Sequence, residues 1–322
     1  MKAAILYEEK KGYNGIKEYS QWLYDGLSDS LFPSFIPIKS IEIKIGNKRL
    51  FGDTTKKLYN KFMNLKKYDI VHQTSFFNLN KYADITTVHD VFPLTLDAYK
   101  KTGYTIIYYK NALEKIKKLK AIIVPSNVVK KDLESYIDTS NVYAIPTGIP
   151  DLNNNYKNPY PDNNKMHLVT VGSIYLKNRK GRKRIEELFK FVKQLPDVEL
   201  YQIGNIDDPE YVNYSENIIN LGFVDEYTKY SYLKYADKYV YYTYNEGEGF
   251  PAMEAMKLNT QVLVNDIPVH HEILGDKAYY FNDFDEFIDN LYKPKKPGLV
   301  EQISQYDNWI EKYIKIYNEI VK

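Results

Sequence analysis

The sequence predicts an α/β protein made of two Rossmann-like, doubly wound domains that face each other across a cleft. Two observations support this fold class: strand-like and helical stretches alternate along the chain, and one polar stretch interrupts the series near its middle. In doubly wound sheets, ligands bind beyond the carboxyl ends of the strands. We therefore expect functional residues in the turns that follow the strands.

The first alternating series occupies residues 1–150, the expected N-terminal, acceptor-side domain. Its expected strands are Ala3–Tyr7, Asp69–His72, Ile85–His89, Ala121–Val124 and Val142–Ile145. Helices are expected where apolar residues recur at spacings of three and four. These are Ile16–Leu27, Lys56–Leu65, Thr105–Leu119 and Val128–Tyr136.

Residues 151–165 are rich in Asn, Pro and Asp, which predicts an interdomain linker with little apolar surface to bury. A second series over residues 166–298 forms the expected C-terminal domain. Its strands are expected at His167–Val171, Val198–Ile203, Ile218–Leu221, Tyr239–Thr243 and Gln261–Val264. Its helices are expected at Ile185–Gln194, Tyr227–Ala236 and Asp285–Leu291, and a last helix at Val300–Val321.

Composition narrows the class of protein. The 322 residues are enough for two domains, and 44% hydrophobic with 27% charged residues is typical of globular chains. The absence of cysteine excludes disulfides, thiolate nucleophiles and cysteine zinc sites. No apolar run reaches the length of a membrane span and no signal peptide is evident, so a cytoplasmic location is expected.

Charge is distributed unevenly along the chain. Residues 1–150 carry 23 Lys and Arg against 15 Asp and Glu, a net +8, whereas residues 151–322 carry a net −6. The basic half is compatible with an anionic acceptor, with peripheral contact to an anionic membrane, or with a solvated lysine-rich surface. Residues 56–67 are a candidate basic amphipathic helix for membrane contact, or a helix that faces the core. No nucleic-acid partner is expected.

The most informative segment runs from Glu246 to Glu254, after an expected strand and into an expected helix. Pro251 suits a first helical turn, and glycines such as Gly249 let the backbone approach a ligand. The amides of a helix start favour a phosphate, while a carboxylate one turn later, at Glu254, can bind a neutral polyol. This combination suits a nucleotide-sugar. The alternative is a glycine turn before a helix with solvated glutamates.

The segment Glu246–Glu254, followed by Asp266–Pro268 and Glu272–Phe281, resembles the donor-site signature of retaining glycosyltransferases of family 4. Weaker matches recur in family order along nearly the whole chain, including His89-Asp90, Val124–Ser126 and Leu221-Gly222. The resemblance implies the GT-B fold, with residues 299–322 crossing back onto the first domain. Asn259 replaces a usual glycine after the signature helix, and it tolerates the left-handed conformation that this position requires.

The resemblance also assigns roles to residues. It implies that Glu254 accepts hydrogen bonds from the ribose hydroxyls and that Glu246 and His89 lie at the transferred sugar. Arg179 and Lys180 would bind the donor phosphates, with Lys177 or Lys183 as a further cation. The remaining donor contacts are expected at Gly15, Val224, Gly249, Phe250, Pro251 and Ala252.

The expected activity is transfer of a hexose, of the mannose or glucose type, from a GDP- or UDP-linked donor to an acceptor hydroxyl. The acceptor would be a glycan, a lipid or a protein-linked sugar. Retention of configuration is implied by the resemblance. Independence from metal is expected because cations and a helix start can stabilise the departing diphosphate. Asp283 and Asp285 resemble a metal motif, but a helix N-cap at Asp283 explains them better. His270-His271 is interpreted as a surface turn and not as a metal pair.

Three alternatives remain open at this point. A nucleotide-sugar epimerase or a sugar phosphorylase would share the fold, and a non-catalytic scaffold that binds sugars would share the donor-side features.

Overall fold

The computed structural model divides into two compact units. The first comprises Met1–Pro150 with Gln305–Lys322, and the second comprises Asp151–Ser304. The structure describes residues 1–8, 15–38, 43–45, 48–50, 60, 62–95, 103–152, 155–175, 183–303 and 305–322. Within that part of the chain, no helix is long and apolar enough to cross a membrane.

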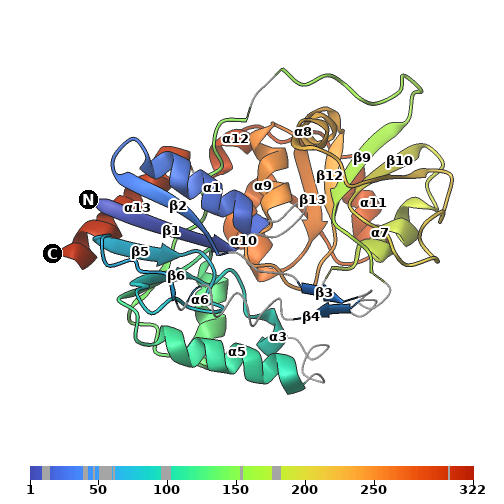
Figure 1. The fold of residues 1–322 in the computed structure, drawn as a ribbon. Coiled ribbons are helices and arrows are strands. Elements are labelled where there is room, and N and C mark those ends of the chain that lie inside the picture. Colours follow the sequence, from blue (N-terminus) through green and yellow to red (C-terminus); the bar gives the residue numbers. More distant parts are fainter. Residues whose placement is uncertain are drawn as a thin grey trace. The chain divides into compact units, whose positions relative to one another are not determined.

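The first unit is built on a parallel sheet with strand order β2-β1-β5-β6-β7-β8 (Figure 1). The strands are β1 (Lys2–Glu8), β2 (Phe32–Ile38), β5 (Ile70–Gln73), β6 (Ile85–Thr87), β7 (Ala121–Val124) and β8 (Val142–Ala144). The helices are α1 (Gly15–Leu27), α3 (Phe92–Thr95), α5 (Gly103–Ile116), α6 (Asn127–Glu134) and α13 (Tyr306–Val321). An antiparallel hairpin of β3 (Ile43–Ile45) and β4 (Lys48–Leu50) stands apart from this sheet. The strand order reverses between β1 and β5, which marks the switch point of this sheet.

Strand β2 is absent from the sequence prediction, because its segment carries Pro33 and Pro37. Proline cannot donate a ladder hydrogen bond and is confined to edge strands or their ends. Among the described strands, β2 lies at the edge of the sheet and pairs with β1 alone. Its other side forms no ladder hydrogen bonds, so a proline there leaves none unmade.

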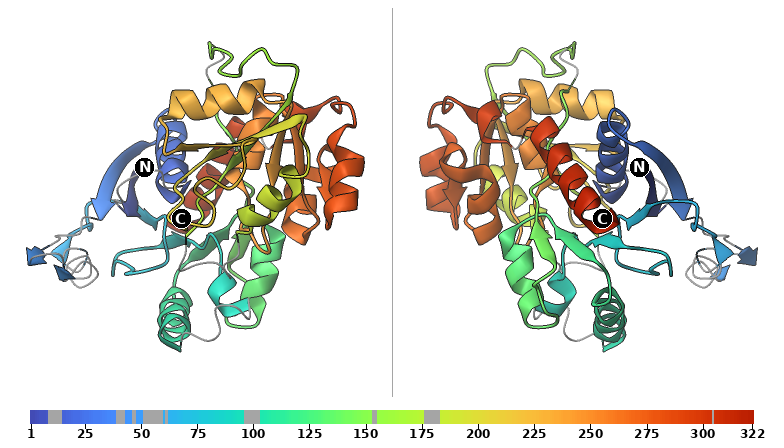
Figure 2. Two further views of the ribbon diagram at one scale, coloured as in Figure 1. Left: turned by 90° about the vertical axis from the view of Figure 1, so that its right-hand side faces the viewer. Right: turned by 90° about the vertical axis from the view of Figure 1, so that its left-hand side faces the viewer.

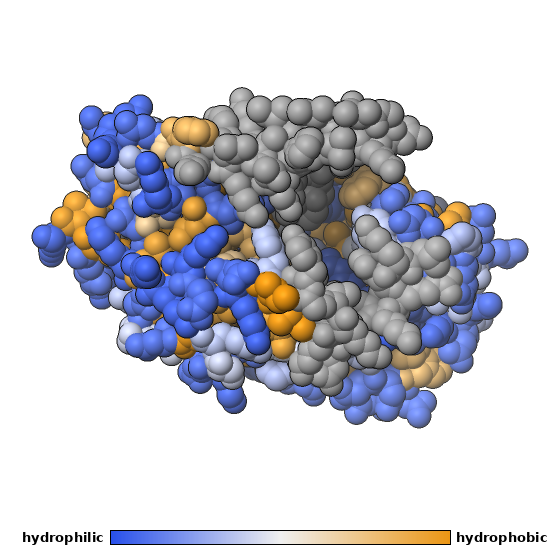
Figure 3. All heavy atoms as spheres, turned by 60° about the horizontal axis from the view of Figure 1, so that its bottom comes forward, coloured by the Kyte–Doolittle hydropathy of each residue, from blue (hydrophilic) through white to orange (hydrophobic). Residues whose placement is uncertain are grey.

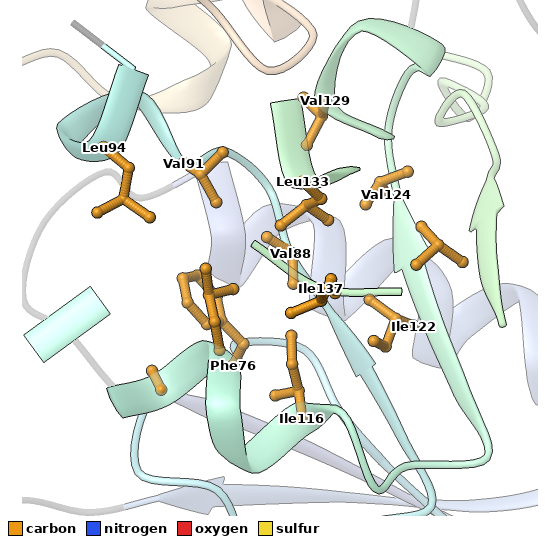
Figure 4. Close-up of a cluster of buried hydrophobic side chains, with 13 residues drawn as sticks. Phe76, Val88, Val91, Leu94, Ile116, Ile122, Val124, Val129, Leu133 and Ile137 are labelled. Carbon is orange, nitrogen blue, oxygen red and sulfur yellow. The ribbon is translucent and has the colours of Figure 1, made fainter. Parts of the chain in front are cut away.

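Helices pack on both faces of this sheet. Side chains of α5 and α6 meet those of β7 and β8 in a buried apolar cluster (Figure 4). The cluster contains Phe76, Val88, Val91, Leu94, Ala112, Leu113, Ile116, Ile122, Val124, Val129, Leu133, Ile137 and Val142. The opposite face carries α1 and α13, which contact each other and the strands β1 and β5.

Helix α13 packs against α1 and β5 within the first unit, and it is the red helix near the C-terminus in the right-hand view of Figure 2. A Cβ added to Gly148 would lie 2.7 Å from Tyr306 Cα, so only glycine permits this approach. Trp309, Tyr313 and Tyr317 are fully buried. Where the sequence predicts one helix over residues 300–321, the structure has α12 (Leu299–Gln302) in the second unit and α13 in the first.

A buried hydrogen-bond network also links α13 to the sheet. The Tyr313 hydroxyl lies 2.6 Å from that of Tyr19, which lies 2.9 Å from Thr87 Oγ1. His72 Nε2 lies 2.9 Å from the same Thr87 oxygen, and His72 Nδ1 lies 2.7 Å from the Tyr317 hydroxyl. Burial lowers the pKa of His72 to about 3, so its imidazole is neutral within the network.

The second unit has a parallel sheet with strand order β11-β10-β9-β12-β13-β14. The strands are β9 (Met166–Val171), β10 (Val198–Ile203), β11 (Ile218–Gly222), β12 (Lys238–Tyr241), β13 (Gln261–Asn265) and β14 (Tyr279–Phe281). The helices are α7 (Ile185–Val192), α8 (Glu226–Tyr235), α9 (Phe250–Lys257), α10 (Pro268–Leu274), α11 (Phe284–Leu291) and α12, with a 3₁₀ turn η2 (Gly275–Lys277). This is the order of Rossmann dinucleotide-binding sheets, and its switch point lies between β9 and β12.

The segment expected to be a linker packs against the second unit in its described part. Tyr156 and Tyr160 are both more than 90% buried. The Tyr160 hydroxyl donates to Tyr232 O at 2.8 Å, and the Tyr156 ring centre lies 5.4 Å from that of Tyr227. The composition is polar, but these tyrosines supply enough apolar surface to hold the segment on α8.

Hydrophobic side chains are scattered among hydrophilic ones on the surface shown in Figure 3. The large hydrophobic residues that the described surface exposes include Phe32, Phe62, Ile107, Phe223 and Tyr227, which come from different elements. Such isolated exposure is ordinary for a folded domain.

Candidate active site

The switch point of the second unit lies where β9 and β12 end. The turn after β9 contains Gly172, and a Cβ added there would meet the terminal methyl group of Ile185. Lys183 pairs with Thr243 in an antiparallel bridge, so the chain returns beside the turn that follows β12. The Asn265 amide holds that turn by accepting from Thr243 N at 2.9 Å and donating to Thr243 O.

Glu246 lies in the turn after β12. Its side chain is half-buried and its Oε1 accepts a hydrogen bond from the Tyr241 hydroxyl at 2.8 Å. Tyr241 is the last residue of β12, so the sheet itself orients this carboxylate. Glu246 also lies near enough to His270 to favour that residue's charged form electrostatically.

Gly249 is the N-cap of α9 and has a left-handed backbone, with φ of +86°. Pro251 stands in the first helical turn, as the sequence predicts. Ala252 N donates to Gly249 O at 3.0 Å, and proline has no N–H to offer. Of the amides expected to face a donor, the Ala252 amide is therefore engaged within α9, and Pro251 has none to offer.

Glu254 lies one turn into α9 and is fully buried. Its Oε1 lies 2.8 Å from Lys229 Nζ and accepts from the Tyr230 hydroxyl at 3.1 Å. Both partners come from α8, which packs on α9. The sequence analysis does not identify Lys229, because its 25-residue separation from Glu254 gives no local signal.

Val224 is half-buried and follows Gly222, the end of β11, where φ is +66°. The next residue, Asp225, is the N-cap of α8 and accepts from Thr228 N at 2.7 Å. Val224 therefore lies at the carboxyl edge of the sheet, two residues before a helix start. Asp283 is likewise the N-cap of α11, which confirms the capping interpretation of that residue.

The cations expected to bind the donor phosphates are described only in part. Arg179, Lys180 and Lys177 lie outside the described residues. Lys183 is described, with its Nζ 5.9 Å from the centre of the Tyr241 ring. The next cation, Arg184, is held by Glu186 and Glu187 and by the Tyr244 hydroxyl.

In the first unit, the expected site residues gather at the carboxyl edge of the sheet. Gly15 is the first residue of α1, and Ser20 Oγ of that helix lies 2.7 Å from Thr74 Oγ1, after β5. His89, after β6, donates from Nε2 to Thr74 O at 3.0 Å, since a carbonyl can only accept. Burial lowers the pKa of His89 to about 4. The ring is therefore neutral, and its Nδ1 is the acceptor nitrogen.

The interpretation of His270-His271 as a surface turn is wrong. Both residues lie in α10, and His270 is fully buried, with Nδ1 donating to Asn265 O at 2.8 Å. Burial lowers the pKa of His270. His271 is exposed and lies 2.7 Å from Asp266 Oδ1, so the two side chains do point apart. Among the described residues, no group of three or more His, Asp or Glu side chains is arranged to hold a metal ion.

Comparisons with known proteins bear on the same region. Residues 165–293 match the family model described as "Glycosyl transferases group 1". The chain is 26% identical over 267 residues to the O-antigen chain mannosyltransferase RfbU of Salmonella typhimurium, covering 79% of this chain and 71% of that protein. It is also 26% identical over 234 residues to the processive diacylglycerol alpha-glucosyltransferase of Acholeplasma laidlawii, covering 62% and 68%.

Among solved structures, HepE of Anabaena, crystallised with UDP and glucose, superposes with a TM-score of 0.70 at 12% identity. The alignment covers 98% of this chain and 99% of HepE. These findings confirm the resemblance, the α/β GT-B fold and the enzyme class that the sequence predicts: the protein is a glycosyltransferase.

Proposed function

We propose that the protein is a retaining glycosyltransferase that moves a hexose from a nucleoside-diphosphate sugar to an acceptor hydroxyl. The observation that supports this most is the position of Glu246, Gly249 and Glu254 on one turn and helix start at the switch point of a Rossmann-ordered sheet. Nucleotide ligands bind at that place in such sheets. The whole segment lies within the span that matches the family.

The proposed division of roles follows from the chemistry of the side chains. Glu254 accepts hydrogen bonds from the ribose, while the start of α9, at Gly249 and Pro251, meets the donor diphosphate with the positive end of the helix. Arg179 and Lys180 supply the charge that a departing diphosphate needs without metal. In the resulting reaction the acceptor attacks the anomeric carbon from the face that the diphosphate leaves.

His89 and Glu246 are assigned to the transferred sugar in this proposal. His89 is neutral at physiological pH because its pKa is about 4. It therefore contributes a hydrogen-bond acceptor at Nδ1 for a sugar hydroxyl and no positive charge. Glu246 contributes a carboxylate whose orientation Tyr241 fixes.

The names of the two curated relatives support a mannose- or glucose-type donor, and they suggest a glycan or a lipid as the acceptor. A transfer assay in excess EDTA tests these points, with UDP-glucose and GDP-mannose as donors and oligosaccharides or diacylglycerol as acceptors. We expect transfer from one donor, with the anomeric configuration of the product, read by NMR, the same as in the donor. An inverted product, or activity only with added Mg²⁺, would contradict the proposed mechanism.

The same assay separates the alternatives. A changed sugar when donor is incubated without acceptor indicates an epimerase, and sugar release that requires phosphate indicates a phosphorylase. Absence of turnover with a full donor panel, despite nucleotide binding, indicates a binding scaffold.

In this proposal, the part of the protein that contacts an anionic membrane is the acceptor-side domain, residues 1–150. Residues 56–59 and 61 of the candidate helix at residues 56–67 lie outside the described residues, and residues 63–67 are not helical. Of its described part, Phe62 is 77% exposed whereas Leu65 is buried. Co-sedimentation with anionic liposomes tests the contact: we expect binding at low salt that high salt abolishes, and no binding at low salt would contradict it.

A further inference from the structure

Lys229 and Glu254 form an ion pair in the interior of the second unit. Lys229 Nζ lies 2.8 Å from Glu254 Oε1, and the two side chains are 4% and 0% exposed. Each residue lies about one turn into its helix, Lys229 in α8 and Glu254 in α9. The pair therefore joins two helices that both begin at the carboxyl edge of the sheet.

Aromatic rings surround the pair. Lys229 Nζ lies 4.3 Å from the centre of the Tyr230 ring, and Tyr230 donates its hydroxyl to the same carboxylate oxygen that Lys229 contacts. Tyr156, from the segment before β9, packs against Tyr230 and Tyr227 with ring centres 5.8 Å and 5.4 Å away. These rings reduce the access of water to the ion pair.

A buried carboxylic acid without a cation favours its neutral form, because burial removes the water that stabilises the charge. A neighbouring ammonium group reverses that preference. Ionised Glu254 accepts hydrogen bonds at both oxygens, up to about four in total. Its bonds to Lys229 and Tyr230 are therefore compatible with further bonds from ribose hydroxyls.

We propose that Lys229 is a positioning residue for nucleoside recognition: it keeps Glu254 ionised and fixes one carboxylate oxygen, so that the carboxylate is presented to the donor ribose. This inference rests on the proposed function, which assigns the ribose to Glu254. It adds a lysine of α8 to a site otherwise built from α9, and it predicts that Lys229 governs the preference for ribose over 2′-deoxyribose.

The test is calorimetric titration of the full chain with UDP and GDP and with their 2′-deoxy analogues, at about pH 6 and about pH 8. We expect Lys229→Met to weaken binding of the preferred ribonucleotide about tenfold or more at the lower pH, with partial recovery at the higher pH, where Glu254 ionises again. The preference for ribose over deoxyribose should fall as well. Lys229→Arg should restore most of the affinity, because it restores the charge.

Lys234→Met is the matched control. Lys234 lies on the same helix, is half-buried, and also lies beside tyrosine rings, 5.9 Å from the centres of Tyr156 and Tyr235. Its variant should bind the nucleotide as the native protein does. Native affinity, pH dependence and sugar preference in Lys229→Met would overturn the inference.

Two further variants keep the test decisive if Lys229→Met folds poorly. The pair Lys229→Met with Glu254→Gln removes both charges, and we expect it to bind no more weakly than Glu254→Gln alone. A further loss in the double variant would show that Lys229 acts separately and would overturn the inference. Unchanged binding in Glu254→Gln alone would instead contradict the proposed function on which it rests.

Discussion

Gly249 shows how one backbone conformation shapes the site. Its φ of +86° is one that residues with a side chain rarely adopt, and an added Cβ would have no heavy atom within 4 Å. The cost of a substitution is therefore backbone strain and not a clash. We expect Gly249→Ala to lower the free energy of unfolding by about 1 kcal/mol in urea denaturation.

Gly249→Asn is the control for this prediction, because asparagine tolerates the left-handed region better than alanine. Its loss of stability should be smaller than that of Gly249→Ala. Equal losses in the two variants would show that something other than φ at this position determines the cost.

At the residue scale, the sequence predicts the local features of the candidate site well. Gly249 as a turn residue, Pro251 in a first helical turn and Asn259 in the left-handed conformation (φ of +62°) follow from neighbouring residues, and the structure has them all. The role of Lys229 depends on how α8 packs on α9, which no local pattern encodes. The burial of His270 has no local sequence signal either, since it depends on the packing of α10.

At the scale of elements, α13 has a predictable energetic role. Trp309 is fully buried and its ring packs between those of Tyr19 and Tyr313, at centre distances of 5.6 Å and 5.4 Å. We expect Trp309→Ala to lower the free energy of unfolding by about 3–5 kcal/mol in urea denaturation.

Val321, at the end of the same helix and 43% exposed, provides the control. Val321→Ala should change stability by less than about 0.5 kcal/mol. Similar effects of the two substitutions would contradict the packing of α13 described here.

The sequence predicts most elements because their periodicity is strong, and the failures have identifiable causes. Strand Val198–Ile203 is predicted to the residue, since an apolar run bounded by turns leaves few alternatives. β2 is missed because its prolines argue against a strand unless its place at the sheet edge is known. The division of the last predicted helix into α12 and α13 follows the separation into units, which sequence periodicity does not show.

At the scale of the whole molecule, pH links the His72 network to stability. The pKa of His72 falls from 6.5 to about 3 on folding, so between these values the unfolded chain binds a proton that the folded chain does not. Stability therefore decreases as the pH falls through this window. Between pH 7 and pH 5 we expect His72 to account for a loss of about 2 kcal/mol.

Urea denaturation of His72→Gln at the two pH values measures this contribution. The variant is expected to be less stable than the native protein at pH 7 but to lose less stability on acidification. A native slope in His72→Gln would contradict the assignment.

The central claim is that Glu254, at the start of α9, binds the ribose of a nucleotide donor. Calorimetric titration of the native protein and of Glu254→Gln with UDP and GDP tests it most directly. The account predicts that one nucleotide binds the native protein and that the variant binds it about 10–150-fold more weakly, as loss of a charged hydrogen bond worth about 1.5–3 kcal/mol requires. Equal affinity of the two proteins, or no binding of either nucleotide, would contradict it.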